Sequence, residues 1–300
     1  MNNILIERAA AMRSEHEMLE LILNTANNDD RVRAVVMNGS RVNPNAPKDF
    51  FQDYDVVYIV TEKESFWADP GWIKVFGELM ILQLPDEMSD PPPGDRDFYG
   101  YLMQFADGNR IDLSLLPLDK LDKLKEDSLT LTLLDKDGIL PKFPPPNDSG
   151  YLPVPPTAKA FFDCTNEFWW VSPYAAKGLW RKEIIYAKLM LDEYVREELV
   201  KMLCWYIGMR TDFAVSIGKM GKYFEKYLEP ELWQMLLQTY SDADYEHSWQ
   251  ALLTMGELFR KIAIPVAEHF GFEYPHGDNE RVSAHLRYVH HLPHDAKEMY

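Results

Sequence analysis

The sequence predicts an α+β chain, with a sheet flanked by helices in its first half and an all-helical bundle in its second half. Two patterns predict this division. Short apolar runs with a period of two residues recur before residue 135, whereas apolar residues after residue 157 recur at helical spacing. Seven prolines over residues 141–157, without periodicity, indicate an extended linker. We therefore expect one domain over 1–140 and a second over 158–300.

The first domain is expected to begin with a helix over 2–26, whose apolar face holds Met12, Leu19, Ile22 and Leu23. Its strongest pair of strands is 99–105 and 110–116, because both alternate and they flank Asp107-Gly108, a hairpin signal. The other expected elements are strands over 32–37 and 53–60, two helical pieces over 64–77, a short buried strand over 79–84, a surface loop over 85–97, a short helix over 118–126 and a strand over 129–134.

The second domain reads as a series of helices. A helix is expected over 157–171, and Ser172-Pro173 then predicts a helix start, because serine caps helices and proline suits their first turn. The helix that begins there is expected to reach residue 195, with further helices over 196–209, 212–227, 230–240 and 243–270. Residues 272–300 hold five histidines without a neighbouring cysteine or an H-E-x-x-H motif, which favours a surface tail over a metal site.

Composition excludes several classes of function. A formal net charge of −17 argues against a nucleic-acid surface, which needs a basic stripe. Such a field would attract cations, although solubility is the simpler explanation for most of this charge. Two cysteines without C-x-x-C spacing indicate neither a disulfide framework nor a zinc site. No apolar stretch approaches the roughly 20 residues of a membrane span, and the first residues lack the layout of a signal peptide. We expect a cytoplasmic protein, either a monomer or a weak dimer.

The most informative stretch is 31–61, where a glycine–serine turn separates two strands. Period-2 alternation puts Asp53 and Asp55 on one face of the second strand. Two adjacent carboxylates repel each other, and a divalent cation such as Mg²⁺ removes that conflict. The Gly39-Ser40 turn offers backbone N–H groups and a hydroxyl to phosphate oxygens. Alone, the D-x-D pair is usually solvated and the G-S pair is only a turn; together they favour a metal site beside phosphate.

A third carboxylate belongs to the strand over 110–116. Ile111, Leu113 and Leu115 occupy one face of that strand and Asp112 the other. Asp112 alone would most simply face water. If its strand pairs beside the strand of Asp53 and Asp55, however, its carboxylate joins the same cation, as phosphoryl-type transfer requires. We expect the three carboxylates to converge on one metal ion.

This pattern of G-S, D-x-D thirteen residues after the serine and a lone aspartate in an apolar strand resembles the nucleotidyltransferase superfamily of DNA polymerase beta type. Longer stretches resemble the aminoglycoside 6-adenylyltransferases, the streptomycin-modifying enzymes, over nearly the whole chain. They are MNGSRVNPNAPKDFFQDYDVVYIV, RIDLSLLPLDKL, NEFWWVSPYAAKGLWRKEIIYAKLMLDEYVREELVKMLCWYIGM and GKYFEKYL. The tryptophan-rich helices narrow the family, because the first motif is shared widely.

The resemblance implies a nucleotidyltransferase mixed sheet followed by a helical acceptor-binding domain. It implies transfer of AMP from Mg²⁺-ATP to the 6-hydroxyl of streptomycin, which confers antibiotic resistance. Gly39 and Ser40 would then hold the distal phosphates, with Arg41 close by. Asp53 and Asp55 would bind Mg²⁺, and Asp112 would be a metal ligand or the base that accepts the hydroxyl proton.

The acceptor site is less defined. Asp163, Glu167 and Trp170 share one helical face and would suit the guanidinium groups of streptomycin. Lys177 and Lys201 could reach the triphosphate, although a solvated helix face is equally possible for each. For Asn166 and Glu183, a binding role and a solvated helix face are likewise equally possible. For each of Trp169, Trp170 and Trp180, core packing is the simpler interpretation.

Other acceptors and one other class of function remain open. The same motifs suit a nucleotidyltransferase that acts on another aminoglycoside or a lincosamide, because nucleotide-binding residues do not determine the acceptor. An antitoxin-like nucleotidyltransferase module is disfavoured by the long helical half.

Overall fold

The structure is a computed structural model that describes residues 11–90, 97–124 and 127–299. The chain divides into two compact units, Met1–Gly150 and Tyr151–Tyr300, and the division falls within the proline-rich segment 141–157. Each unit has a hydrophobic core of its own. Apart from a short 3-10 turn, η4 (Ser149–Tyr151), that segment contains neither helix nor strand.

A six-stranded mixed sheet forms the framework of the first unit in the part of the chain that the structure describes. The strand order is β3-β4-β5-β2-β1-β6, and β2 and β5 are parallel while the other neighbours are antiparallel. The strands are β1 (Val32–Asn38), β2 (Tyr54–Val60), β3 (Leu79–Gln83), β4 (Tyr99–Phe105), β5 (Arg110–Pro117) and β6 (Leu131–Asp135). The expected mixed sheet flanked by helices is confirmed.

The two faces of the sheet are covered by different elements. On one face, α1 (Glu15–Asn28), α2 (Glu64–Ala68) and the 3-10 helix η1 (Trp72–Phe76) bury alternate residues of the central strands, among them Tyr58 and Leu115. On the other face, the 3-10 helix η3 (Leu118–Lys123) and segment 139–143 pack over Ala34, Val36 and Ile59. The expected short helix over 118–126 is η3, and residues 125–126 lie outside the described residues.

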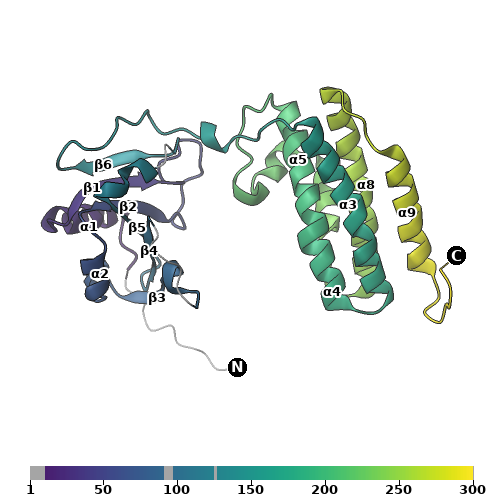
Figure 1. The fold of residues 1–300 in the computed structure, drawn as a ribbon, viewed down its shortest axis with the longest axis horizontal. Coiled ribbons are helices and arrows are strands. Elements are labelled where there is room, and N and C mark those ends of the chain that lie inside the picture. The colour runs from purple at the N-terminus through teal and green to yellow at the C-terminus, as the bar shows by residue number, and fades with distance from the viewer. Residues whose placement is uncertain (1–10, 91–96, 125–126, 300) are drawn as a thin grey trace. The chain divides into compact units, whose positions relative to one another are not determined.

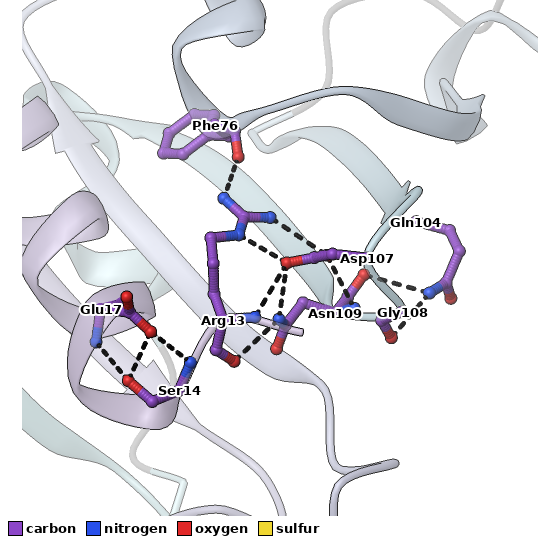
Figure 2. A network of polar contacts seen from close by, with 8 residues as sticks. All are labelled: Arg13, Ser14, Glu17, Phe76, Gln104, Asp107, Gly108 and Asn109. Carbon is purple, nitrogen blue, oxygen red and sulfur yellow. Dashed lines mark hydrogen bonds and ion pairs between the residues drawn. The ribbon is translucent and has the colours of Figure 1, made fainter. Parts of the chain in front are cut away.

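A network of polar contacts fixes the turn between β4 and β5 to the start of α1 (Figure 2). Arg13 donates from Nε to Oδ2 of Asp107 over 2.6 Å and from Nη1 to the carbonyl oxygen of Phe76 over 2.5 Å. Asn109 donates from its amide to Asp107 and to the Arg13 carbonyl oxygen. Burial alone would raise the pKa of Asp107, but these hydrogen bonds hold it well below its usual range. The network secures the start of β5.

Helix α1 begins later than the expected residue 2. Within the described residues it starts at Glu15, and residues 1–10 lie outside them. Ser14 and Glu17 form a capping box, in which the Ser14 hydroxyl accepts from the Glu17 N–H and the Glu17 carboxylate accepts from the Ser14 N–H. Met12, expected on the apolar face, therefore precedes the helix and is exposed.

Strand β3 forms where it was expected, but the prediction that it is buried is wrong. Its place at the edge of the sheet leaves Met80 and Ile81 63% and 65% exposed, while Leu79 packs against the core. An apolar run predicts a buried strand only if other elements cover both of its faces. The following loop starts with a 3-10 turn, η2 (Pro85–Glu87), and its residues 91–96 lie outside the described residues.

The second unit is an all-helical bundle over its described residues, as expected. Figure 1 shows the long helices side by side, and α9 packs against α3. The segments are α3 (Ala158–Trp180), α4 (Ile184–Leu189), the π-helical η5 (Met190–Val195), α5 (Arg196–Arg210), η6 (Lys219–Gly221), α6 (Phe224–Tyr227), α7 (Pro230–Gln238), α8 (Tyr245–Phe270) and α9 (His276–His291). Among the described residues of both units, no helix has the length and apolar character needed to cross a membrane.

The predicted helix start at Ser172-Pro173 is wrong, because α3 continues through both residues. The Ser172 hydroxyl donates to the carbonyl oxygen of Phe168 over 2.7 Å, four residues back in the helix. Proline inside a helix costs about 3 kcal/mol. Burial of the face around it offsets that cost, since Phe168 stacks on Phe259 of α8 with ring centroids 3.8 Å apart.

Two further helix predictions fail in the second unit. Residues 212–218 are not helical, and Gly218 and Gly221 adopt positive φ angles of 72° and 77°. The expected irregular tail is instead helical as α9. Its buried residues, Asn279, Ser283, Leu286 and Val289, recur at helical spacing. Because two of these four are polar, the hydrophobic pattern that normally reveals a helix is weak here.

Candidate active site

The parallel pairing of β2 and β5 places Asp55 directly beside Asp112, as partners in register. Asp53 precedes β2 by one residue and shares the face of Asp55 by alternation. Tyr54, between Asp53 and Asp55, and Ile111, directly before Asp112, are buried in the core on the opposite face. The fold therefore brings the three predicted aspartates to the beginning of two adjacent strands.

Arg110 lies between these carboxylates. It stands two residues before Asp112 on the same face of β5, donating from Nε to Oδ1 over 2.7 Å and from Nη2 to Oδ2 over 2.8 Å. Its Nε is also 3.7 Å from Oδ2 of Asp53. The hydrogen bonds to Asp112, followed by the charges of Asp53 and Asp55, raise the pKa of Arg110 further above its ordinary value. One guanidinium group thus interacts with all three aspartates.

Asp53 occupies a less favourable environment for a negative charge. Burial raises the pKa of its carboxyl, the positive charge of Arg110 opposes this, and the neighbouring charge of Asp112 adds to the increase. The side chain is 38% exposed, so it is desolvated without being enclosed. A carboxylate in this setting is stabilised by any additional cation that approaches it.

The turn after β1 lies against the second aspartate. Gly39 has a φ angle of +76°, and a Cβ at this position would lie 2.0 Å from Oδ2 of Asp55. Only glycine therefore allows the Asp55 carboxylate to rest on the turn backbone. Asn38 is the register partner of Asp55 across β1 and β2, and its Oδ1 is buried without a hydrogen-bond partner among the described residues. Such an acceptor suits a ligand that supplies a donor or a cation.

Ser40 and Arg41 are tied to the chain that leads into β2. The Gln52 amide donates to the carbonyl oxygen and the hydroxyl of Ser40 over 3.1 and 3.3 Å. Arg41 donates to the carbonyl oxygens of Gln52 and Asp53 and stacks over the Tyr54 ring at 3.6 Å. Its side chain is only 7% exposed. Arg41 thus positions the chain at Asp53, and the expected contact between its guanidinium and phosphate stays a prediction.

The donor set fits a hard divalent cation, because it consists of carboxylate oxygens and an amide oxygen on rigid strands. The side chains do not yet surround a common point. Among residues 11–90, 97–124 and 127–299, no three His, Cys, Asp or Glu side chains are gathered closely enough to hold a metal ion. Arg110 holds Asp112, while Asp55 lies over Gly39. Coordination of Mg²⁺ by all three aspartates therefore stays a prediction.

The residues expected at the acceptor site lie on the exposed face of α3. Trp170 is 64% exposed and forms an edge-to-face contact with Tyr174. It lines a cavity of about 590 Å³ between α3 and α9, called here the α3–α9 cavity. Asp163 pairs with Lys159, and Glu167 is exposed. The cavity is lined by Asn166, Trp169, Trp170, Pro173, Tyr174, Asp278, Arg281, Val282 and His285.

The two lysines expected to reach the triphosphate have local partners in the helical unit. Lys177 lies 4.8 Å from the ring centre of Tyr174. Lys201 donates to both carboxylate oxygens of Glu198, over 2.8 and 2.9 Å. Burial alone would lower the pKa of Lys201, but the pair with Glu198 outweighs burial and raises it. Phosphate binding by either lysine stays a prediction.

The other open positions of the helical unit differ in burial. Trp169 is 2% exposed and belongs to the core, as the simpler interpretation held. Trp180 is partly buried and donates from Nε1 to the carbonyl oxygen of Leu292 over 2.9 Å. Asn166 and Glu183 are exposed.

Sequence reasoning missed Arg110 and Asn38. The signal for Arg110 was present, because the alternation that assigns Asp112 to one face of β5 assigns Arg110 to the same face. Asn38 follows the buried Val36 by two residues and shares its face for the same reason. Its unsatisfied oxygen, however, depends on packing that the sequence does not specify.

Known proteins and one family model match most of the chain. The family model described as streptomycin adenylyltransferase matches residues 12–289. An aminoglycoside 6-adenylyltransferase of Bacillus subtilis strain 168 is 41% identical over 269 residues, covering 89% of this chain and 95% of that protein. The enzyme of the same name from Campylobacter jejuni is 42% identical over 276 residues, covering 92% and 95%. A crystal structure of an aminoglycoside 6-adenyltransferase from Bacillus subtilis is 35% identical, with a TM-score of 0.47, covering 94% of this chain and 100% of that one.

Proposed function

The chain belongs to the streptomycin adenylyltransferase family, a family of nucleotidyltransferases, and we propose that it transfers AMP from Mg²⁺-ATP to the 6-hydroxyl of streptomycin, releasing pyrophosphate. The names of the relatives support an aminoglycoside as the acceptor and position 6 as the site of transfer. The description of the family model supports streptomycin among the aminoglycosides. Modification of the drug would confer resistance to it.

One observation carries the proposal, namely the register in which Asp55 of β2 lies beside Asp112 of β5. Nucleotidyl transfer needs carboxylates on rigid elements beside a phosphate-binding turn. The strands supply the carboxylates, and Gly39 brings the turn into contact with Asp55. A surface D-x-D pair without function would need neither the third aspartate nor the close approach of the turn.

The proposed chemistry assigns a role to each group. When bound, Mg²⁺ would neutralise charge on the α-phosphate and on the leaving pyrophosphate. Asp53 and Asp55 would hold it, and the Gly39-Ser40 turn would orient the distal phosphates. The oxygen of the acceptor hydroxyl attacks the α-phosphorus as the bond to pyrophosphate breaks. Asp112 can accept the hydroxyl proton, a contribution of about 10²–10⁴ in rate.

The α3–α9 cavity is our candidate for acceptor recognition in the helical unit. Streptomycin is a polar cation that carries guanidinium groups, and such groups favour aromatic faces and carboxylates. Trp170 and Tyr174 offer the aromatic faces, and Asp278 offers a carboxylate on the lining. Glu167, exposed on the same helix three residues before Trp170, can add a second carboxylate near that tryptophan.

The acceptor is tested by incubating the full-length protein with Mg²⁺-ATP and a panel of aminoglycosides and lincosamides. Mass spectrometry should detect AMP added to streptomycin, and a coupled assay should detect one pyrophosphate for each AMP transferred. Adenylylation of another aminoglycoside in place of streptomycin would mean that the acceptor is that aminoglycoside. Pyrophosphate release without any modified drug would contradict it.

The metal assignment is tested by Asp55→Asn, which keeps the size of the side chain and removes its charge. We expect the rate of transfer to fall at least 100-fold because a charged ligand is lost, with little change in melting temperature. Asp137→Asn is the matched control, since Asp137 pairs with Arg33 and is 39% exposed. Normal turnover by Asp55→Asn would refute its assignment as a metal ligand.

A further inference from the structure

Arg110 is held by the carboxylates that the proposed metal site requires. Within the part of the chain that the structure describes, its guanidinium makes hydrogen bonds and ion pairs only to Asp112 and Asp53. Gln104, its register partner on β4, donates instead to the carbonyl oxygens of Gly108 and Asn109. The Arg110 side chain is 40% exposed, so it has solvent into which it can turn.

We propose that Arg110 is an internal counter-cation, which partly balances the charge of the aspartates in the metal-free enzyme and competes with a divalent cation for Asp112. This inference rests on the proposed function, because it assumes that the same aspartates bind the metal. The inference assigns Arg110 as a positioning residue that controls the affinity of the site for the metal ion.

The three carboxylates repel one another. Asp55 and Asp112 are register partners on adjacent strands, and Asp53 shares their face. Without a positive charge among them, their mutual repulsion would destabilise the start of both strands. The planar guanidinium binds both oxygens of Asp112 at once, a geometry that a carboxylate matches well.

The same two hydrogen bonds compete with metal binding. Oδ1 and Oδ2 of Asp112 each accept from Arg110, so the guanidinium occupies one lone pair of each oxygen and places a positive charge beside any metal ion that approaches Asp112. The absence of a preformed group of three metal-binding side chains among the described residues is consistent with this competition.

A simple structural role for Arg110 makes the opposite prediction. If the ion pair only held Asp112 in the right place for the metal, removal of Arg110 would weaken metal binding. If Arg110 acted only through its charge at a distance, lysine at this position would leave metal affinity unchanged. Competition through the planar, two-point contact predicts that both glutamine and lysine strengthen metal binding.

The experiment measures binding of Mn²⁺ alone, without nucleotide, to the full-length protein by electron paramagnetic resonance. We expect Arg110→Lys to bind about two- to fivefold more tightly than wild type, the range set by a partly exposed ion pair. Arg110→Gln should bind at least about fivefold more tightly, because it also loses a positive charge. Arg33→Gln is the matched control, since Arg33 makes a two-point contact with Asp137 away from the site, and it should leave affinity unchanged.

A second readout separates folding from metal binding. In EDTA, Arg110→Gln should melt about 2–4 °C below wild type because the aspartates lose their counter-cation, and added Mn²⁺ should close most of that gap. Unchanged or weaker Mn²⁺ binding by both Arg110 variants would overturn the inference and leave the metal site standing. If wild type and both variants fail to bind Mn²⁺ even with ATP, the metal site of the proposed function fails as well.

Discussion

Replacing Gly39 with alanine should remove most of the transferase activity while the protein still folds. The new Cβ would lie 2.0 Å from Oδ2 and 2.9 Å from Cγ of Asp55, where Cβ contacts below 3.0 Å essentially never occur. The Asp55 carboxylate must therefore move by about 1 Å. A displacement of that size at a catalytic group costs on the order of 100-fold in rate. The φ angle of +76° adds a backbone cost of about 1–2 kcal/mol for a residue with a side chain.

Gly138 provides the control, because it separates the backbone cost from the collision. Its φ angle is +65°, and a Cβ there would meet nothing within 4 Å. Gly138→Ala should therefore lose a similar stability of about 1–2 kcal/mol and keep its activity. Both variants are assayed for melting temperature and for kcat with Mg²⁺-ATP and streptomycin.

The difference in kcat between the two variants is the decisive measurement. A kcat for Gly39→Ala within about threefold of that for Gly138→Ala would show that Asp55 tolerates displacement, and the contact between turn and carboxylate would lose its functional meaning. A large loss of activity in both variants would instead indicate that backbone strain, and not the position of Asp55, limits turnover.

Three other substitutions test one ion pair in the first unit and two tryptophans in the second. Asp107→Asn should lower stability by about 2 kcal/mol at pH 7, because the hydrogen bonds from Arg13 are charge-assisted. The pKa of Asp107 is depressed in the folded protein, so its stabilisation is present above the unfolded pKa near 4 and is lost as pH falls below it. Melting curves of variant and wild type should therefore begin to converge as the pH falls below about 4 and continue to converge below pH 3, and a constant gap would contradict the assignment. Trp170→Ala should change the melting temperature little and raise the KM for streptomycin, whereas Trp169→Ala should cost about 3–5 kcal/mol; equal losses of stability would contradict the assignment of exposed and buried tryptophans.

The sequence was sufficient for the sheet because its central strands alternate clearly. In β5, Ile111, Leu113 and Leu115 enter the core and Asp112 does not, as the period of two requires. Alternation alone leaves the pairing of β5 with β2 open. It is a contact between segments more than 50 residues apart in the chain, and no local pattern specifies such a partner.

The wrong predictions for the helical unit have a common physical cause. Local signals favoured a break at Ser172-Pro173 and an irregular chain beyond residue 272, and packing reversed both expectations. Phe168 and Trp169 bury enough surface against α8 to keep α3 intact through the proline. Helix α9 forms with polar residues such as Asn279 on its buried side, and a hydrophobic pattern cannot reveal a helix of that kind.

Arg110 illustrates where prediction of the site from sequence stops. Alternation alone places an arginine and an aspartate, separated by one residue, on the same face of β5. Such a pair is usually a weak surface ion pair worth about 0–1 kcal/mol. What makes it significant is the neighbouring strand, since the β2–β5 register brings Asp55 and the preceding Asp53 into the same electrostatic environment. Residues 53, 55, 110 and 112 therefore have to be considered as one charged cluster, in which Arg110 supplies positive charge to three carboxylates and a metal ion would supply more.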